Sequence, residues 1–211
     1  MSYSTRRSVL VAGAGFAVAG CSGMLGLGGK PSKIYVLSPS FAAAPAALVP
    51  SGQLVVARPI ASQTLRTDRI VLWRSGTLDY YADAQWTDST PALVEALLVE
   101  AFEKDGGMAS VGTEAQGLHA DYLLDSELRD FTARYDTADG APLVVVGIEA
   151  QLVDATRRVV LAARVFHGEA RASANSVPAA VEAFNTATAA VLGEIVDWVR
   201  QSRGRGLPAK P

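Results

Sequence analysis

The sequence predicts an α+β fold, an α/β sandwich in which one mixed, largely antiparallel sheet is covered by two helices. Short runs of β-branched and aromatic residues precede and separate two segments with helical periodicity. Apolar residues make up 49% of the chain and charged residues 19%, which is enough apolar material for a core. A sheet and helices that are each apolar on one side bury that side by packing in layers.

The predicted strands of the first half share a β-branched or aromatic composition and end at turn residues. They cover 33–37, 54–57, 69–74 and 77–81. The last two are separated by Ser75-Gly76, a turn signal, and are therefore expected to form a hairpin.

The second half contains the clearest pair of strands. Residues 120–135 mix apolar and charged side chains, as a half-exposed strand does. Residues 143–153 alternate strictly, and one face of this strand carries Val144, Val146, Ile148, Ala150 and Leu152. After the turn Asp154-Ala155-Thr156, a returning strand alternates through Val159, Leu161, Ala163 and Val165.

Two helices are expected, at 90–105 and 177–201. Thr90-Pro91 supplies an N-cap and a first-turn proline, and Gly106-Gly107 ends the first helix. This helix is apolar over more than one stripe, so it is either buried against the sheet or shared with another subunit. The second helix has one apolar stripe, which predicts core packing. Strands followed by a helix occur in both halves, a faint sign of a duplicated strand-hairpin-helix unit.

Residues 1–20 are typical of a secretory signal peptide. Arg6 and Arg7 supply positive charge before the 13-residue apolar run Ser8–Gly20. As a helix, this run would reach about 20 Å, which is short of the roughly 30 Å hydrocarbon core. Residues 5–10 partly match a twin-arginine export signal, so the Sec and Tat routes both stay open.

Cys21, which is the sole cysteine, follows Val18-Ala19-Gly20 and thereby resembles a bacterial lipobox. Lipidation of its thiol, with two or three acyl chains such as palmitate, would give a durable anchor, whereas a single chain binds membranes only marginally. Residues 21–32 are rich in Gly and Ser and are expected to be a lipidated tether, and 202–211 a flexible tail. Ser22 after the cysteine, by analogy with lipoprotein sorting, favours the outer membrane.

Composition excludes several functions. Cleavage after residue 20 leaves 17 basic and 21 acidic side chains, a net charge near −4, which argues against nucleic-acid binding and against electrostatic attraction to anionic lipid. One cysteine and two histidines offer little for a metal site. His119 and His167 lie far apart, and the sequence contains no nucleotide-binding loop and no nucleophile elbow. We therefore expect no catalytic residues, no metal and no cofactor.

Asp121, Asp125, Glu127 and Asp130 lack the glycine and glutamate spacing of a calcium loop, so a solvated strand face is expected. Tyr80, Tyr81 and Trp86 form an aromatic cluster before the first helix. They are candidates for packing where the helix docks on the sheet, or alternatively for contact with a partner or lipid.

A set of these residues resembles the ABC-type transport auxiliary lipoprotein family, which includes the PqiC-like lipoproteins. The resemblance covers about residues 33–200 and rests on segments in the first half: Tyr35-Val36-Leu37, Val55-Val56-Ala57-Arg58-Pro59, Leu65–Asp68, Arg69–Arg74, Leu78, Tyr81 and Trp86. The final long helix also fits.

The resemblance implies a non-enzymatic, lipid-anchored periplasmic protein. Such a protein would work beside an ABC permease, its ATPase and an MCE-domain protein that together move phospholipids or other hydrophobic compounds across the cell envelope, and a homo-oligomer is compatible with this role. Two other classes stay open at this point, namely an envelope structural or assembly lipoprotein and a lipid-anchored hydrolase.

Overall fold

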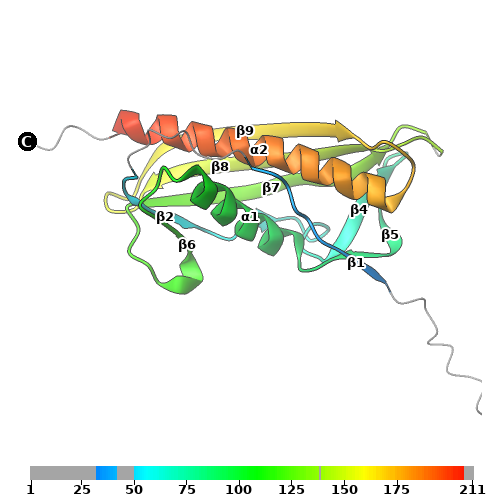
Figure 1. Ribbon diagram of the computed structural model, residues 1–211, viewed down its shortest axis with the longest axis horizontal. Coiled ribbons are helices and arrows are strands. Elements are labelled where there is room, and N and C mark those ends of the chain that lie inside the picture. Colours follow the sequence, from blue (N-terminus) through cyan, green and yellow to red (C-terminus); the bar gives the residue numbers. More distant parts are fainter. Residues whose placement is uncertain (1–31, 42–49, 138, 207–211) are drawn as a thin grey trace, which may run out of the picture. The chain divides into compact units, whose positions relative to one another are not determined.

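The structure, a computed structural model, describes residues 32–41, 50–137 and 139–206, with side chains to Arg203. Arg6, Arg7, Cys21 and most of the expected tether lie outside this range. The described residues form a mixed sheet with both helices packed on one of its faces (Figure 1).

The strands are β1 (Lys33–Tyr35), β2 (Gln53–Val56), β3 (Ile60–Ala61), β4 (Arg69–Arg74), β5 (Thr77–Trp86), β6 (Ser110–Thr113), β7 (Tyr122–Tyr135), β8 (Leu143–Asp154) and β9 (Val159–Arg171). The helices are α1 (Thr90–Asp105), a 3-10 turn (Glu114–Gln116) and α2 (Val177–Gly206).

Strand β7 organises the sheet. One of its edges pairs with β8 antiparallel along the whole strand, and β8 pairs antiparallel with β9. The other edge of β7 pairs in parallel with β2, then β3, then β4. Strands β6 and β1 join in parallel at β2 and β5. The sheet is therefore mixed, as predicted, with antiparallel long pairs and short parallel additions.

The predicted β4–β5 hairpin is confirmed, and β5 continues to Trp86. Ser75 and Gly76 have φ angles of 50° and 84°, the left-handed geometry that a two-residue hairpin turn requires at both positions. A register shift between Arg69 and Val71, next to Asp83 with φ 54°, bends the far end of the hairpin.

The core lies between the sheet and the helices. The predicted face of β8, with Val144, Val146, Ile148, Ala150 and Leu152, is 0% exposed. Phe184 of α2 stacks on Phe131 of β7 at 4.8 Å between ring centroids, and Trp86 meets both rings edge-on. These three rings join a helix, the hairpin and the central strand into one packed unit.

Helix α1 matches its predicted bounds, although Ser89 rather than Thr90 takes the N-cap position. Gly106 ends it in the left-handed conformation, and its N–H donates to the carbonyls of Phe102 and Glu103. The apolar residues of α1 are largely buried within the chain, so its breadth of apolar surface is explained by packing on the sheet and on α2.

Helix α2 begins after Ser176, whose hydroxyl accepts the Ala179 N–H, and runs past the predicted end at Gln201 to Gly206. By length and composition it could cross a membrane, but 56% of its most apolar stretch is buried against the sheet. Gly168 of β9 permits the close approach of α2, because a Cβ there would lie 2.7 Å from Val191 and 3.0 Å from the Ala187 carbonyl.

The prediction for β9 was right about the strand and incomplete about its faces. A register shift at Leu152/Val153 interrupts the expected alternation. Beyond it, Ala163 and Val165 pair with Gln151 and Glu149, on the face opposite to the buried one, and Phe166 is the fully buried residue of this strand. The short strands β3 and β6 were not predicted.

Candidate functional site

The β4–β5 hairpin presents aromatic and apolar side chains on the open face of the sheet, the face without helices. We name Arg69, Trp73, Leu78 and Tyr80 the hairpin patch. Trp73 and Leu78 are direct cross-strand partners and are 36% and 49% exposed. The Arg69 guanidinium lies 4.0 Å from the centre of the Tyr80 ring, and the Tyr80 hydroxyl donates to the Thr64 carbonyl at 3.4 Å. The tight turn and these contacts hold the patch in place.

A hollow of about 450 Å³ lies on this face next to Trp73 and Leu78 of the hairpin patch. Its lining also includes the charged side chains of Arg129, Asp130 and Arg134 of β7. Arg134 pairs with Asp130 along β7, while Arg129 pairs with Glu149 of β8. Tryptophan and arginine are enriched at protein interfaces and among the residues that contribute most of the binding energy, so this surface is a candidate protein-binding site.

The three aromatic residues singled out in the sequence separate in the structure. Trp86 is fully buried and takes the packing role, so its side chain offers almost no surface to a partner. Tyr80 belongs to the hairpin patch. Tyr81 points to the helix side, where its hydroxyl lies 2.7 Å from that of Tyr135, and burial first, then this hydrogen bond, raises the pKa of its phenol. Partner contact stays a prediction for Tyr80 and Tyr81.

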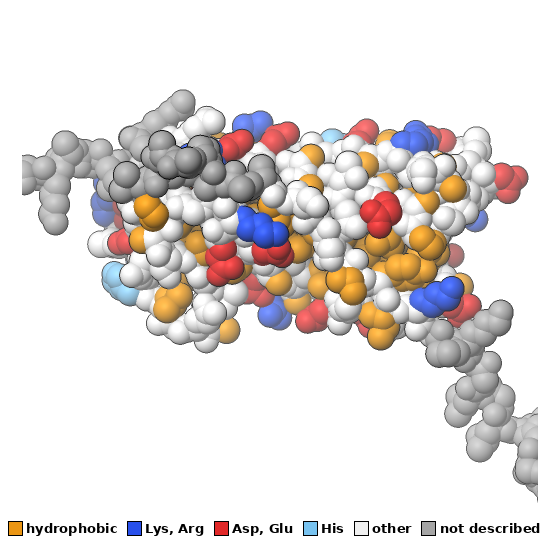
Figure 2. Space-filling model, viewed as in Figure 1, with side chains coloured by type: hydrophobic (Ala, Val, Ile, Leu, Met, Phe, Trp, Pro, Cys, Tyr) orange, Lys and Arg blue, Asp and Glu red, His pale blue; other side chains and the backbone are white. Residues whose placement is uncertain are grey.

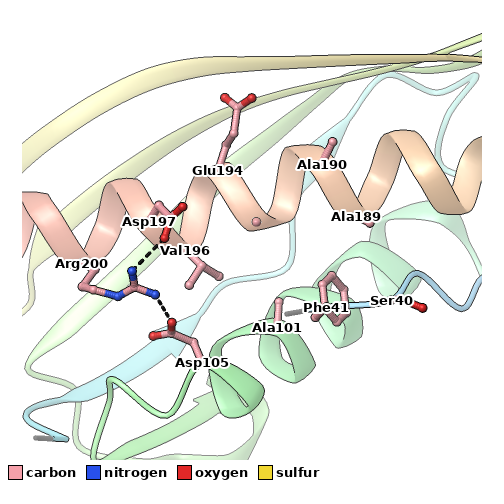
Figure 3. A pocket seen from close by; sticks show the side chains of 11 residues that line it. Ser40, Phe41, Ala101, Asp105, Ala189, Ala190, Glu194, Val196, Asp197 and Arg200 are labelled. Atoms are coloured by element: carbon pink, nitrogen blue, oxygen red, sulfur yellow. Dashed lines mark hydrogen bonds and ion pairs between the residues drawn. The ribbon is translucent and has the colours of Figure 1, made fainter. Parts of the chain in front are cut away.

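A second hollow, the α1–α2 cleft, lies between the carboxyl-terminal halves of the two helices (Figure 3) and has a volume of about 590 Å³. Its lining is mostly small or apolar: Ser40, Phe41, Ala101, Asp105, Ala189, Ala190, Gly193, Glu194, Val196, Asp197 and Arg200. Arg200 reaches from α2 to Asp105 of α1 and also pairs with Asp197 at 2.8 Å. Burial disfavours the charge of Arg200, but hydrogen bonds and attraction to these two carboxylates outweigh it and raise its pKa.

A third hollow, of about 480 Å³, lies where β2 and β7 begin and β8 ends. Asp121 accepts the Gln53 N–H at 2.8 Å, so this carboxylate positions β2. Asp154 accepts the backbone N–H of Arg157 at 2.7 Å, which is the main cause of its lowered pKa. Burial raises the pKa of the Tyr122 phenol beside them. These polar groups serve mainly the turns and strand ends around them.

No hydrogen bond or ion pair joins the two histidines in the part of the chain that the structure describes. Both are exposed, and His167 contacts Glu169 at 3.0 Å on the same strand. Within residues 32–41, 50–137 and 139–206, the histidine, aspartate and glutamate side chains form no group of three that could hold a metal ion.

Sequence reasoning missed Trp73 and Leu78 as surface residues. Both were assigned to strands, and the turn that separates them was recognised. The signal available was their placement at equal distances from the Ser75-Gly76 turn, which makes them cross-strand neighbours. Which face they occupy depends on the pairing of β4 with β7, and that pairing joins segments far apart in the chain.

Known proteins resemble this chain along most of its length. A crystal structure of a protein from Xanthomonas campestris is 27% identical and has a TM-score of 0.76, covering 82% of this chain and 98% of that one. A crystal structure of an uncharacterized protein is 17% identical with a TM-score of 0.63, covering 81% and 99%, and shares the fold.

An uncharacterized protein of Bradyrhizobium diazoefficiens is 34% identical over 183 residues, which is 86% of this chain and 48% of that protein. The chain thus spans about half the length of this relative. Residues 35–196 match the sequence profile of the ABC-type transport auxiliary lipoprotein component. Because the match covers most of the chain and nearly all of the folded domain, the chain belongs to the ABC-type transport auxiliary lipoprotein family.

Proposed function

We propose that this protein is the non-catalytic, lipid-anchored periplasmic component of an MCE-type ABC transporter that moves phospholipids or other hydrophobic compounds across the envelope. It works with the MCE-domain protein, the permease and the ATPase of the same system, and its role is to dock partner proteins at the membrane that holds its anchor. Ser22 after Cys21 favours the outer membrane for that anchor. Family membership is the observation that carries this proposal. The division of the sheet into a helix-covered face and an open face with the hairpin patch supports it.

The anchor is proposed at Cys21. The lipobox-like residues before it and the 13-residue apolar run support lipidation. Replacing Cys21 by serine should release the protein from the membrane fraction, because two or more acyl chains hold a protein where a single chain does not. A Cys21→Ser chain that stays as firmly bound, with no lipid on its amino terminus by mass spectrometry, would contradict the anchor.

Docking is proposed to use the hairpin patch. Truncating Trp73 to serine removes a half-exposed aromatic anchor, and such anchors account for about 2 kcal/mol or more of binding free energy when they lie at the centre of an interface. We expect co-purification of the MCE-domain protein and the permease from solubilised membranes to fall at least tenfold, while circular dichroism shows that the variant keeps its fold. Val165→Ser, also on the open face, is the matched control.

Two results would redirect the proposal. Recovery of peptidoglycan or outer-membrane assembly proteins in place of an ABC system would favour a structural lipoprotein. Unchanged recovery of the transporter with Trp73→Ser would move the docking surface away from the hairpin patch, with the α1–α2 cleft as the next surface to be tested.

A further inference from the structure

The first strand of the domain exposes two β-branched side chains. Ile34 is 63% exposed and Val36 is 61% exposed, whereas Leu37 beside them is buried in the core. β1 pairs with β5 on one side, and no other described strand pairs with its second edge. An unpaired strand edge with exposed apolar side chains is typical of a surface that contacts another molecule or a membrane.

The chain itself limits which surface lies within reach. Eleven residues, Ser22 to Ser32, separate Cys21 from β1. Fully extended, they span at most about 40 Å. If Cys21 carries the anchor, as the proposed function holds, β1 is the strand nearest to the anchor along the chain and lies within reach of the bilayer, and Ile34 follows the described start of the domain by two residues.

The side chains of this segment suit the boundary between lipid headgroups and acyl chains. Lys33 is exposed beside Ile34, and the half-buried Tyr35 packs on the core between the two exposed aliphatic side chains. A lysine can extend its ammonium to the headgroups while its stem and neighbouring apolar side chains enter the interface. Figure 2 shows hydrophobic side chains gathered on the helix side at the end of the molecule where β1 lies. Ile34 alternates with Tyr35, the partner of the buried Trp86, and therefore belongs to the other face of β1.

Apolar contact fits the charge of the protein. The net charge near −4 after cleavage gives no general attraction to an anionic surface, so a contact between the domain and the bilayer would depend on apolar groups. The chain provides a comparison in Val159 and Val160, which are 53% and 52% exposed but lie where β9 begins, at the other end of the sheet from β1 (Figure 1).

We propose that Ile34 and Val36 insert into the interfacial layer of the bilayer that holds the Cys21 lipid, with Lys33 at the headgroups. β1 is then a second membrane contact, which fixes how the domain is oriented on its anchor. The proposal rests on the anchor of the proposed function and adds to it a membrane-contacting surface on the folded domain itself.

The test uses the full chain with Ser32→Cys, purified from membranes so that the Cys21 thiol is already consumed by its lipid. The introduced thiol receives an environment-sensitive fluorophore, and the protein is placed in phosphatidylethanolamine–phosphatidylglycerol vesicles that contain a spin-labelled lipid. Contact quenches the fluorophore. The same labelled chain is prepared with Ile34→Ser and Val36→Ser together, and with Val159→Ser and Val160→Ser together as the matched control.

We expect strong quenching in the parent chain, a loss of more than half of it with the Ile34 and Val36 substitutions, and no change with the control pair. Because all three chains share the tether, the difference isolates the two side chains from mere proximity. Circular dichroism checks that each variant keeps its fold.

The failures are distinguishable. Protein that floats with vesicles but is quenched equally in all three chains overturns the β1 contact and leaves the anchor intact. If the unlabelled Ser32→Cys protein forms disulfides between copies under mild oxidation, and quenching of the labelled protein is insensitive to Ile34 and Val36, the edge is assigned to a second copy and the β1 contact is also overturned. Protein that fails to float and carries no lipid overturns the proposed anchor together with the contact.

Discussion

The two faces of the β7–β8 pair are built from the same strands and do different work. On the helix side, alternate residues from Val144 to Leu152 are fully buried and meet Phe131 and Phe184. On the open side, the residues between them include charged pairs such as Arg129 with Glu149. Strand alternation therefore places most of the buried apolar side chains on the helix side. The open side keeps a smaller buried set, which includes Val145 and Thr132, and carries the charged and exposed residues.

The comparison explains how an auxiliary protein can be stable and still present a specific surface. Trp73 lies opposite Arg134 on the open side, while its neighbour Leu72 lies opposite Ala133 in the core. A substitution at one of these positions is expected to change binding, and at the other stability. The expected effects below follow from this division.

Removing a ring from the buried face should have the largest effect. Phe184→Ala deletes the stacked partner of Phe131 and the edge partner of Trp86, and we expect it to lower the free energy of unfolding by about 3–5 kcal/mol in urea titrations. Val165→Ala on the open face should change it by less than about 0.5 kcal/mol. Equal losses in the two variants would refute the division between faces.

The contact between β9 and α2 can be tested with two glycines. Gly168→Ala forces a Cβ against Val191 and the Ala187 carbonyl, which should cost about 1–3 kcal/mol by overpacking. Gly193→Ala, in the middle of α2, meets no described atom within 4 Å apart from its own helix and should stabilise by about 0.5–1 kcal/mol. Thermal denaturation of the two variants measures both changes in stability. A stabilising Gly168→Ala would show that α2 does not pack against β9 as closely as the structure indicates.

Open-face charges should matter little to stability. Glu127 and Glu149 lie directly opposite one another, and Arg129 contacts both. Arg129→Ala leaves two facing carboxylates, yet the side chains are solvated enough that we expect a loss below about 1 kcal/mol, shrinking as salt rises. A large loss that is independent of salt would mean that these charges are shielded from solvent in the folded chain.

Acid sensitivity should show at Asp154. Its pKa is lowered chiefly by the backbone N–H of Arg157, so the ionised form stabilises the native turn. This contribution is present above the ordinary carboxyl pKa of about 4 and is lost as the pH falls through the lowered value. Asp154→Asn should therefore melt below the parent protein at pH 7, and the gap should narrow as the pH falls below the ordinary carboxyl pKa and close once the pH is below the lowered pKa of Asp154. A gap that is independent of pH would contradict the assignment.

Local patterns predicted the elements well. Pro91 and the Gly106-Gly107 pair were enough to bound α1, and strict alternation identified the buried side of β8. The β4–β5 turn followed from Ser75-Gly76. In each case the information lies within a few residues along the chain, which is the range over which capping, turn geometry and periodicity act.

What could not be predicted depends on long-range pairing. The parallel pairing of β2, β3 and β4 with β7 joins segments far apart in sequence, and two residues of β3 give no periodic signal. The face of Val165 follows from a register shift rather than from composition. The candidate site is missed for the same reason, since Trp73 becomes a surface anchor only once β4 lies beside β7.

The unequal edges of β7 have a consequence for biogenesis. Its β8 edge closes through a neighbouring turn, whereas the other edge accepts strands that leave the ribosome well before β7 does. β4 can pair with β5, and β2 with β6, before β7 emerges, but the edges of β2, β3 and β4 that face β7 stay open to solvent until the β7–β8–β9 meander exists as a template. Such late, non-local closure slows folding, and it makes the nascent first half the part of this protein that most needs chaperone protection.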